Sequence, residues 1–178
     1  MHYPIVFLII FIAGCANPLN RVTSDRYAEE CTRAENRGNL AVAEQACYRA
    51  LVNVDWGNLG EGLKSERLYN LARIKRRLYK FSEAEELLKQ SLEIQEKLTG
   101  PSSPKIGRRL AELSVNLAGQ DKWSEGVPLV ERLMTMTDLF SGHEKDFIKE
   151  ILQKYSEHLI EIGNEEKANL FSVKANKL

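Results

Sequence analysis

The chain has 178 residues, and 43% of them are hydrophobic, so it is long and apolar enough to bury a core and is not intrinsically disordered. Its 25 basic and 25 acidic side chains cancel, which excludes a protein that holds nucleic acid through bulk positive charge. Three cysteines are too few for a scaffold built from disulfides. All of the formal charges follow an apolar block at the N-terminus.

That apolar block is too short to cross a bilayer. Residues 5–12 form an unbroken run of eight apolar residues, whereas a spanning helix needs about 20. The run is typical of the hydrophobic region of a secretory signal. An aliphatic residue, two small residues and Cys15 follow, in the order IAGC, which resembles the lipobox of bacterial lipoproteins. The resemblance implies that residues 1–14 are a signal peptide and that Cys15 is lipidated.

The lipobox also implies a location. Several acyl chains such as palmitate on one cysteine would anchor the mature chain stably. Ala16 stands where an aspartate retains lipoproteins at the inner membrane, so we expect an outer-membrane lipoprotein that faces the periplasm. The alternative is a buried N-terminal helix or an unprocessed anchor, but the apolar run has no polar face. Residues 15–23 show no periodicity, and we expect them to be the lipidated cysteine and a tether.

From residue 24 onward, apolar residues recur with the period of about 3.6 that is typical of helices, and no strand-like alternation appears. Turn signals rich in glycine, asparagine and proline divide this part into eight expected helices, with tight turns alternating with longer loops. The turns are expected at residues 37–39, 57–62, 79–80, 99–104, 120–121, 141–142 and 163–164.

The expected helices repeat as hairpins of about 42 residues. One large residue recurs at intervals of 41, 42 and 42 residues: Tyr27, Leu68, Leu110 and Leu152. A small residue follows each of them after 16 positions: Ala43, Ala84, Gly126 and Ala168. Small residues are needed where two antiparallel helices cross closely, so these positions indicate the crossing points of four hairpins.

The second hairpin resembles the tetratricopeptide repeat in the 42-residue variant of kinesin light chains. The likeness lies in LYNLA at residues 68–72, FSEA at 81–84, LEI at 92–94 and GPSSP at 100–104, and it is looser in the first and fourth hairpins. It implies an all-α fold, an α-solenoid of four hairpins in a right-handed superhelix. The expected domain covers residues 24–178, with repeats at about 24–61, 62–103, 104–142 and 143–178.

Two departures fall in the last two repeats. Pro128 lies inside an expected helix, which therefore either starts late with Ser124 as its N-cap or kinks. The last helix carries Leu170, Phe171 and Val173 without a capping helix after it. We expect this helix either to fray or to pack on a partner or on a second copy of the chain. Packing on a second copy would make the protein a homodimer.

In the repeat frame, Cys31 and Cys47 lie on the facing sides of the first hairpin. They are candidates for a disulfide in an oxidising periplasm, and the alternative is a pair of buried free thiols. His158 and Glu161 lie one helical turn apart, but no third metal ligand is evident. The sequence has no HExxH, no glycine-rich phosphate loop and no GxSxG, so we expect no metal, no cofactor and no enzyme.

The resemblance implies that the first helix of each repeat lines a concave groove. The candidate partner-binding residues in it are Tyr69, Asn70, Arg73, Arg76, Arg77, Arg108 and Val115. Guanidinium groups suit carboxylates, so we expect an acidic or carboxylate-ended peptide there. The alternative is that these arginines belong to a solvated charged face.

The sequence is therefore interpreted as a membrane-anchored, periplasm-facing lipoprotein that serves as a non-catalytic protein-interaction scaffold. Its expected partner is a protein or peptide, and no nucleic acid is expected. One alternative is an assembly factor or pilotin for a pilus, a secretin or an outer-membrane protein complex. Another is a structural homodimer built on the last helix.

Overall fold

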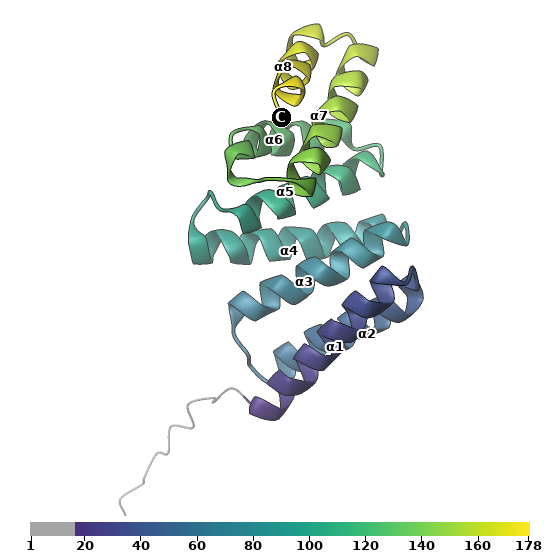
Figure 1. Cartoon of the computed structure of the whole chain (residues 1–178), viewed down its shortest axis with the longest axis vertical. Coiled ribbons are helices and arrows are strands. Elements are labelled where there is room, and N and C mark those ends of the chain that lie inside the picture. The colour runs from purple at the N-terminus through teal and green to yellow at the C-terminus, as the bar shows by residue number, and fades with distance from the viewer. Residues whose placement is uncertain (1–16) are drawn as a thin grey trace, which may run out of the picture.

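The computed structural model describes residues 17–178, so the expected signal peptide and the lipidated Cys15 lie outside the described residues. The described chain forms eight α-helices and one short 3₁₀ helix, without a strand (Figure 1). The elements are α1 (Pro18–Asn36), α2 (Leu40–Trp56), α3 (Glu61–Arg77), α4 (Phe81–Thr99), α5 (Pro104–Ala118), α6 (Trp123–Met134), η1 (Thr137–Leu139), α7 (His143–Glu161) and α8 (Glu165–Asn176). Among these helices none has the length and apolar character needed to cross a membrane.

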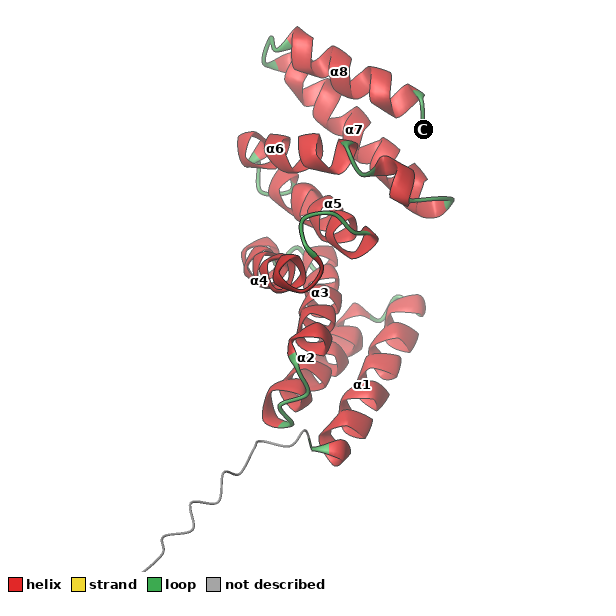
Figure 2. Ribbon diagram, turned by 90° about the vertical axis from the view of Figure 1, so that its left-hand side faces the viewer, coloured by secondary structure: helices red, strands yellow, loops and turns green. Residues whose placement is uncertain are grey.

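Consecutive helices pair as hairpins, which stack along the long axis of the molecule (Figures 1 and 2). The pairs are α1 with α2, α3 with α4, α5 with α6, and α7 with α8. This arrangement confirms the predicted all-α solenoid of four hairpins.

The first helix begins earlier than expected. The Asn17 side chain accepts a hydrogen bond of 3.0 Å from the Leu19 amide, and Pro18 occupies the first helical position. Both residue types are favoured at these positions. Residues 18–23 are therefore the first turns of α1, and the predicted tether over residues 15–23 is wrong for that part. The capping pair outweighs the lack of apolar periodicity that suggested a tether.

Pro128 lies inside α6, which starts at Trp123, so the expected late start with Ser124 as N-cap is wrong. Proline has no amide hydrogen, and α6 therefore lacks one internal hydrogen bond at this point. The helix is 12 residues long, against 19 for α4, and η1 follows it before α7.

The small residues predicted at the hairpin crossings are buried. Ala43 and Ala84 are 0% exposed and Ala168 is 2% exposed. At Gly126 the approach is closest, since an added Cβ atom would lie 1.8 Å from the Tyr155 hydroxyl oxygen. Tyr155 belongs to α7, so Gly126 sets how closely the third and fourth repeats pack.

Gly126→Ala is expected to lower the free energy of unfolding by about 2 kcal/mol, because Tyr155 must move from its packed position. The control is Gly62→Ala in α3, where the nearest atom to an added Cβ is 3.9 Å away, in the Leu98 side chain. That variant should gain about 0.5 kcal/mol from helix propensity. Urea unfolding followed by circular dichroism measures both, and equal effects at the two sites would contradict the packing argument.

Ion pairs join neighbouring repeats at regular spacing. On the second helices and the turns before them, Nζ–carboxylate distances are 2.7 Å for Lys80–Glu44, 2.8 Å for Lys122–Glu85 and 2.7 Å for Lys167–Glu131. Each pair spans 36 or 37 residues, just under one repeat. The same relation therefore recurs at each junction between repeats.

Glu85 is the most buried acid among these pairs, at 8% exposure. Burial alone would raise the pKa of its carboxyl, but hydrogen bonds from Lys122, Lys89 and Gln120 outweigh it and lower the pKa to about 2. Because the folded pKa lies below its ordinary value of 4.5, the stabilisation is complete above that pH and is lost as the pH falls toward 2.

Glu85→Gln is expected to lower the free energy of unfolding at pH 7 by about 2 kcal/mol and to flatten its decline between pH 5 and pH 2. The control is Glu93→Gln, since the pair of Glu93 with Lys97 is exposed and contributes little. Urea titrations across this pH range give the comparison. Parallel stability curves for the wild type and Glu85→Gln would refute the assigned pKa shift.

Candidate functional site

Two cavities lie along helices α3, α5 and α7, the first helices of the last three repeats. The large cavity, of about 580 Å³, lies at the C-terminal ends of α3 and α5, beside the middle of α7. The small cavity, of about 230 Å³, begins one turn away on the same helices, toward their N-terminal ends and near the start of α7. We call the two together the groove.

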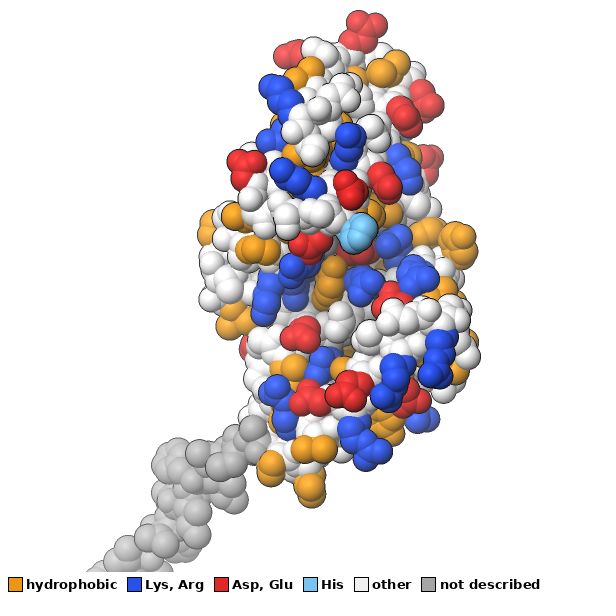
Figure 3. All heavy atoms as spheres, viewed as in Figure 1, with side chains coloured by type: hydrophobic (Ala, Val, Ile, Leu, Met, Phe, Trp, Pro, Cys, Tyr) orange, Lys and Arg blue, Asp and Glu red, His pale blue; other side chains and the backbone are white. Residues whose placement is uncertain are grey.

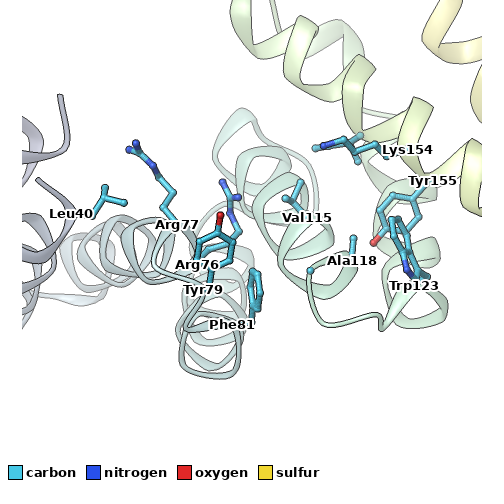
Figure 4. A pocket seen from close by; sticks show the side chains of 12 residues that line it. Leu40, Arg76, Arg77, Tyr79, Phe81, Val115, Ala118, Trp123, Lys154 and Tyr155 are labelled. Carbon is cyan, nitrogen blue, oxygen red and sulfur yellow. The ribbon is translucent and has the colours of Figure 1, made fainter. Parts of the chain in front are cut away.

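The large cavity has an apolar wall from three equivalent positions (Figure 4). Leu40, Phe81 and Trp123 are the first residues of α2, α4 and α6. Val115 of α5 and Tyr155 of α7 complete the wall between them. Aromatic and aliphatic groups gathered in this way suit the burial of an apolar side chain.

The aromatic part of the wall is held in place by its own contacts. The Trp123 indole nitrogen donates a hydrogen bond of 2.8 Å to Asp121, and its ring stacks on His158 with centroids 4.4 Å apart. Trp123 also meets Tyr155 edge to face at 5.1 Å. The Tyr155 hydroxyl donates to the Ser114 carbonyl at 2.8 Å, and burial raises the pKa of Tyr155 well above its usual value. The wall is therefore formed before any partner arrives.

The rim of the large cavity is cationic. It carries Arg76, Arg77 and Lys154, and none of the described residues that line the cavity is acidic. Arg76 donates to Glu112 at 2.7 Å and Arg77 donates to Glu35 at 2.9 Å, both outside the lining. Lys154 has no ion pair or side-chain hydrogen bond recorded within residues 17–178. Lys154 is thus the cation most available to a ligand.

The small cavity is more nearly balanced in charge. The guanidinium of Arg73 lies 2.9 Å from Glu35 and 3.6 Å from Glu112, and Arg108 donates to Glu144. The ring of Tyr69 lies beneath Arg73, with the guanidinium carbon 5.8 Å from the ring centroid. Burial, with the nearby Glu112 charge, raises the pKa of Tyr69 to about 12. The charges of Arg73 and Arg108 are thus neutralised by glutamates within the fold.

A family model of the tetratricopeptide repeat matches residues 66–105. Among solved structures, the chain is similar to BtubC (BKLC) from P. vanneervenii, with a TM-score of 0.77, 18% identity and coverage of 89% of this chain. It is also similar to a putative kinesin light chain with nearly identical TPR-like repeats from Podosopora anserina, with a TM-score of 0.67, 17% identity and coverage of 86% of this chain and 74% of that one. The chain has the fold of a tetratricopeptide-repeat solenoid.

The likeness to these structures has a defined extent. The chain spans 63% of the length of BtubC, and identities below 20% establish the tetratricopeptide fold rather than a shared partner. No curated protein matches the chain by sequence. The tetratricopeptide fold is compatible with a protein-interaction scaffold.

Six of the seven predicted groove residues line the two cavities of the tetratricopeptide array. Tyr69, Arg73 and Arg108 line the small cavity, while Arg76, Arg77 and Val115 line the large one. Asn70 lies apart from both, in a shallow polar depression between α1 and α3.

The predicted arginines are not free charges. Each of the four, Arg73, Arg76, Arg77 and Arg108, contacts a glutamate of a neighbouring tetratricopeptide repeat. The carboxylates that neutralise these arginines reach across from helices 36 to 42 residues away in the chain, so an acidic peptide would compete with them.

Sequence reasoning missed Lys154 and the aromatic wall. Phe81 and Trp123 each stand three residues before a small crossing residue, Ala84 or Gly126, and they also face the large cavity. Lys154 stands 84 residues after Asn70, which is two repeats of 42. Because Asn70 itself lies outside both cavities, this spacing alone does not identify Lys154 as a groove residue.

The structure joins Cys31 of α1 to Cys47 of α2 by a disulfide, with Cα atoms 5.2 Å apart. Both cysteines are at most 3% exposed. The bridge links the two helices of the first repeat, which has no repeat on its outer side within the described residues. His158 stacks on Trp123 with its Nδ1 atom 3.8 Å from Glu161, and residues 17–178 hold no cluster of three or more metal-ligating side chains.

We expect the mature chain, purified without reductant and unfolded in guanidinium, to show no reactive thiol from Cys31 or Cys47 and two after reduction. With a sequence separation of 16, loss of the bridge should destabilise the first repeat by about 3 kcal/mol. A thiol-reactive chromophore counts the thiols, and the double variant Cys31→Ser, Cys47→Ser is the blank. Two reactive thiols before reduction would show that the disulfide between Cys31 and Cys47 is not formed.

Proposed function

We propose that this protein is a periplasm-facing lipoprotein, anchored to the outer membrane through Cys15, that holds an acidic segment of a protein partner in its groove. It acts without catalysis. The observation that carries the proposal is the large cavity, which combines an aromatic wall, a cationic rim and no acidic lining residue among the described residues.

The chemistry of the large cavity favours a segment with an apolar side chain next to a carboxylate. Val115 and the aromatic wall would bury the apolar group, which supplies most of the affinity. Lys154 would meet the carboxylate, supported by Arg77, whose side chain remains 39% exposed beside Glu35. A C-terminal carboxylate and an acidic side chain are both suited to this rim.

The small cavity would contribute less to such binding. A ligand carboxylate there must displace Glu112 or Glu144 from the arginines that they already satisfy. That exchange of one carboxylate for another has little net driving force. The small cavity therefore favours hydrogen bonding and packing against Tyr69 over the capture of charge.

The lipobox supports the anchored part of the proposal. Lipid on Cys15 would restrict the array to the membrane surface and raise its effective concentration near envelope partners. An assembly factor or pilotin would use the same groove and differ only in its client. For the homodimer, α8 exposes Leu170 by 50% and Val173 by 43%, a small apolar surface beside the roughly 800 Å² per partner of stable interfaces. No observation favours the homodimer over groove binding.

A photoreactive residue placed at Val115 in cells should crosslink a segment that contains acidic residues, which mass spectrometry can locate. A synthetic peptide of that segment should bind the mature chain about tenfold more weakly when Lys154→Glu is introduced, and binding should weaken with added salt. Isothermal titration calorimetry measures both effects.

The matched control is Lys97→Glu on α4, which reverses a charge on a side chain that is 71% exposed and lines neither cavity. This variant should bind the peptide like the wild type. Equal binding by Lys154→Glu and the wild type, or captured segments without acidic residues, would show that the groove does not select carboxylates.

A further inference from the structure

Three large apolar side chains are strongly exposed at the N-terminal end of the array. Leu19 and Val22 of α1 are 75% and 58% exposed, and Trp56, the last residue of α2, is 78% exposed. Leu19 and Val22 are three residues apart on α1, so they share one face of the helix. In Figure 3, hydrophobic side chains gather at the end of the molecule that the grey segment joins.

A hydrogen bond holds these side chains close to the point where the described chain begins. The amide of Asn17 donates to the carbonyl of Gly57 at 2.9 Å, which fastens the start of α1 beside the end of α2. Gly57 directly follows Trp56. The first described residue, the exposed turn of α1 and Trp56 therefore all lie at one end of the array.

The proposed lipid attachment point is close to this end. Cys15 stands two residues before Asn17, so their Cα atoms are at most about 8 Å apart. A lipid on Cys15 would hold the start of α1 at the bilayer surface, because no longer linker separates them.

We propose that Leu19, Val22 and Trp56 form a membrane-contact patch that inserts into the headgroup region of the bilayer to which Cys15 anchors the chain. The proposal rests on the lipidation of Cys15 given under the proposed function. Tryptophan is favoured at the membrane interface, and leucine and valine beside it add apolar area. Because the inserted lipid already holds the chain at the bilayer, the effective concentration of the patch there is high, and weak binding by the patch is sufficient.

Two acidic side chains near the patch are paired with cations. Asp55, next to Trp56, is paired with Lys64 at 2.9 Å, and Asp25 is paired with Arg21 at 2.9 Å and with Arg67 at 2.6 Å. Asp25 and Asp55 are thus compensated, whereas Glu61, which lines the same depression as Asp55, makes no ion pair with another described residue.

Arg26 lies four residues after Val22 on the exposed side of α1, without an ion pair recorded in the described part of the chain. It is the cation best placed to meet a phosphate. Glu29 and Glu30 lie on the same helix about 15 Å from Leu19, at 1.5 Å per residue, and so stand farther from the anchored end.

This docking would fix the orientation of the array. The long axis runs from the α1–α2 end to the α7–α8 end (Figure 1), so the later repeats, which carry the groove, would project away from the bilayer. The groove would then face partners rather than lipid.

The test uses the lipidated mature chain in vesicles of phosphatidylethanolamine and phosphatidylglycerol with brominated acyl chains, which quench only tryptophans that contact lipid. The chain has two tryptophans. Trp123→Phe leaves only Trp56, whose emission should shift to the blue and lose intensity in brominated vesicles. Trp56→Phe leaves only Trp123, and its emission should be the same in brominated and ordinary vesicles. Subtracting the Trp56→Phe signal from the wild type gives the same answer if Trp123→Phe misfolds.

Vesicle flotation and intact-mass measurement distinguish the outcomes. Protein that floats with the vesicles while Trp56 is not quenched would overturn the membrane-contact patch and leave the anchor intact. Protein that does not float and has an unmodified Cys15 would overturn both the anchor and the patch. Quenching of Trp56 that disappears in the Leu19→Ser, Val22→Ser variant would support the patch as a unit.

Discussion

The close crossing of two antiparallel helices in each repeat is the constraint on which the rest of the structure depends. It requires a small residue where the second helix passes the first, and Ala43, Ala84, Gly126 and Ala168 supply one per repeat. Gly126 meets a second requirement, from the next repeat, because the Tyr155 hydroxyl of α7 fills the space that a side chain would take. The same tyrosine then forms part of the wall of the large cavity, so packing between repeats and the shape of the groove have one cause.

Regular stacking also determines the electrostatics of the groove. When similar repeats stack regularly, residues at equivalent positions along neighbouring helices lie next to each other. The arginines of α3 and α5 therefore meet glutamates of α1, α5 and α7, and most of the positive charge is satisfied within the fold. A ligand carboxylate finds its best opportunity where this pairing is incomplete, at Lys154 on the rim of the large cavity. Selectivity of the groove would thus arise from the cations that no glutamate of the fold neutralises.

The two ends of the array differ in what they expose. The N-terminal end carries a tryptophan, Trp56, with Leu19 and Val22, close to the expected lipid, while the α7–α8 end exposes the aliphatic residues Ile160, Ile162, Leu170 and Val173. A solenoid that is held at one end and open along its concave side suits the recruitment of a partner to a membrane surface. The pairing of Asp25 and Asp55 with cations reduces the electrostatic repulsion between that end and anionic lipid.

The sequence by itself determined the helices, their pairing into four hairpins and six of the residues that face the groove. These follow from local periodicity and from a repeat of about 42 residues, both of which are properties of the chain read in order. The lack of apolar periodicity before residue 24 wrongly predicted a tether at the start of α1. The capping pair of Asn17 and Pro18 is the local feature that begins the helix there. Only the tertiary structure decided which arginines are neutralised and which aromatic residues face the groove. Those relations join side chains 36 to 42 residues apart, and their partners are set by how closely the repeats stack rather than by neighbours in the sequence.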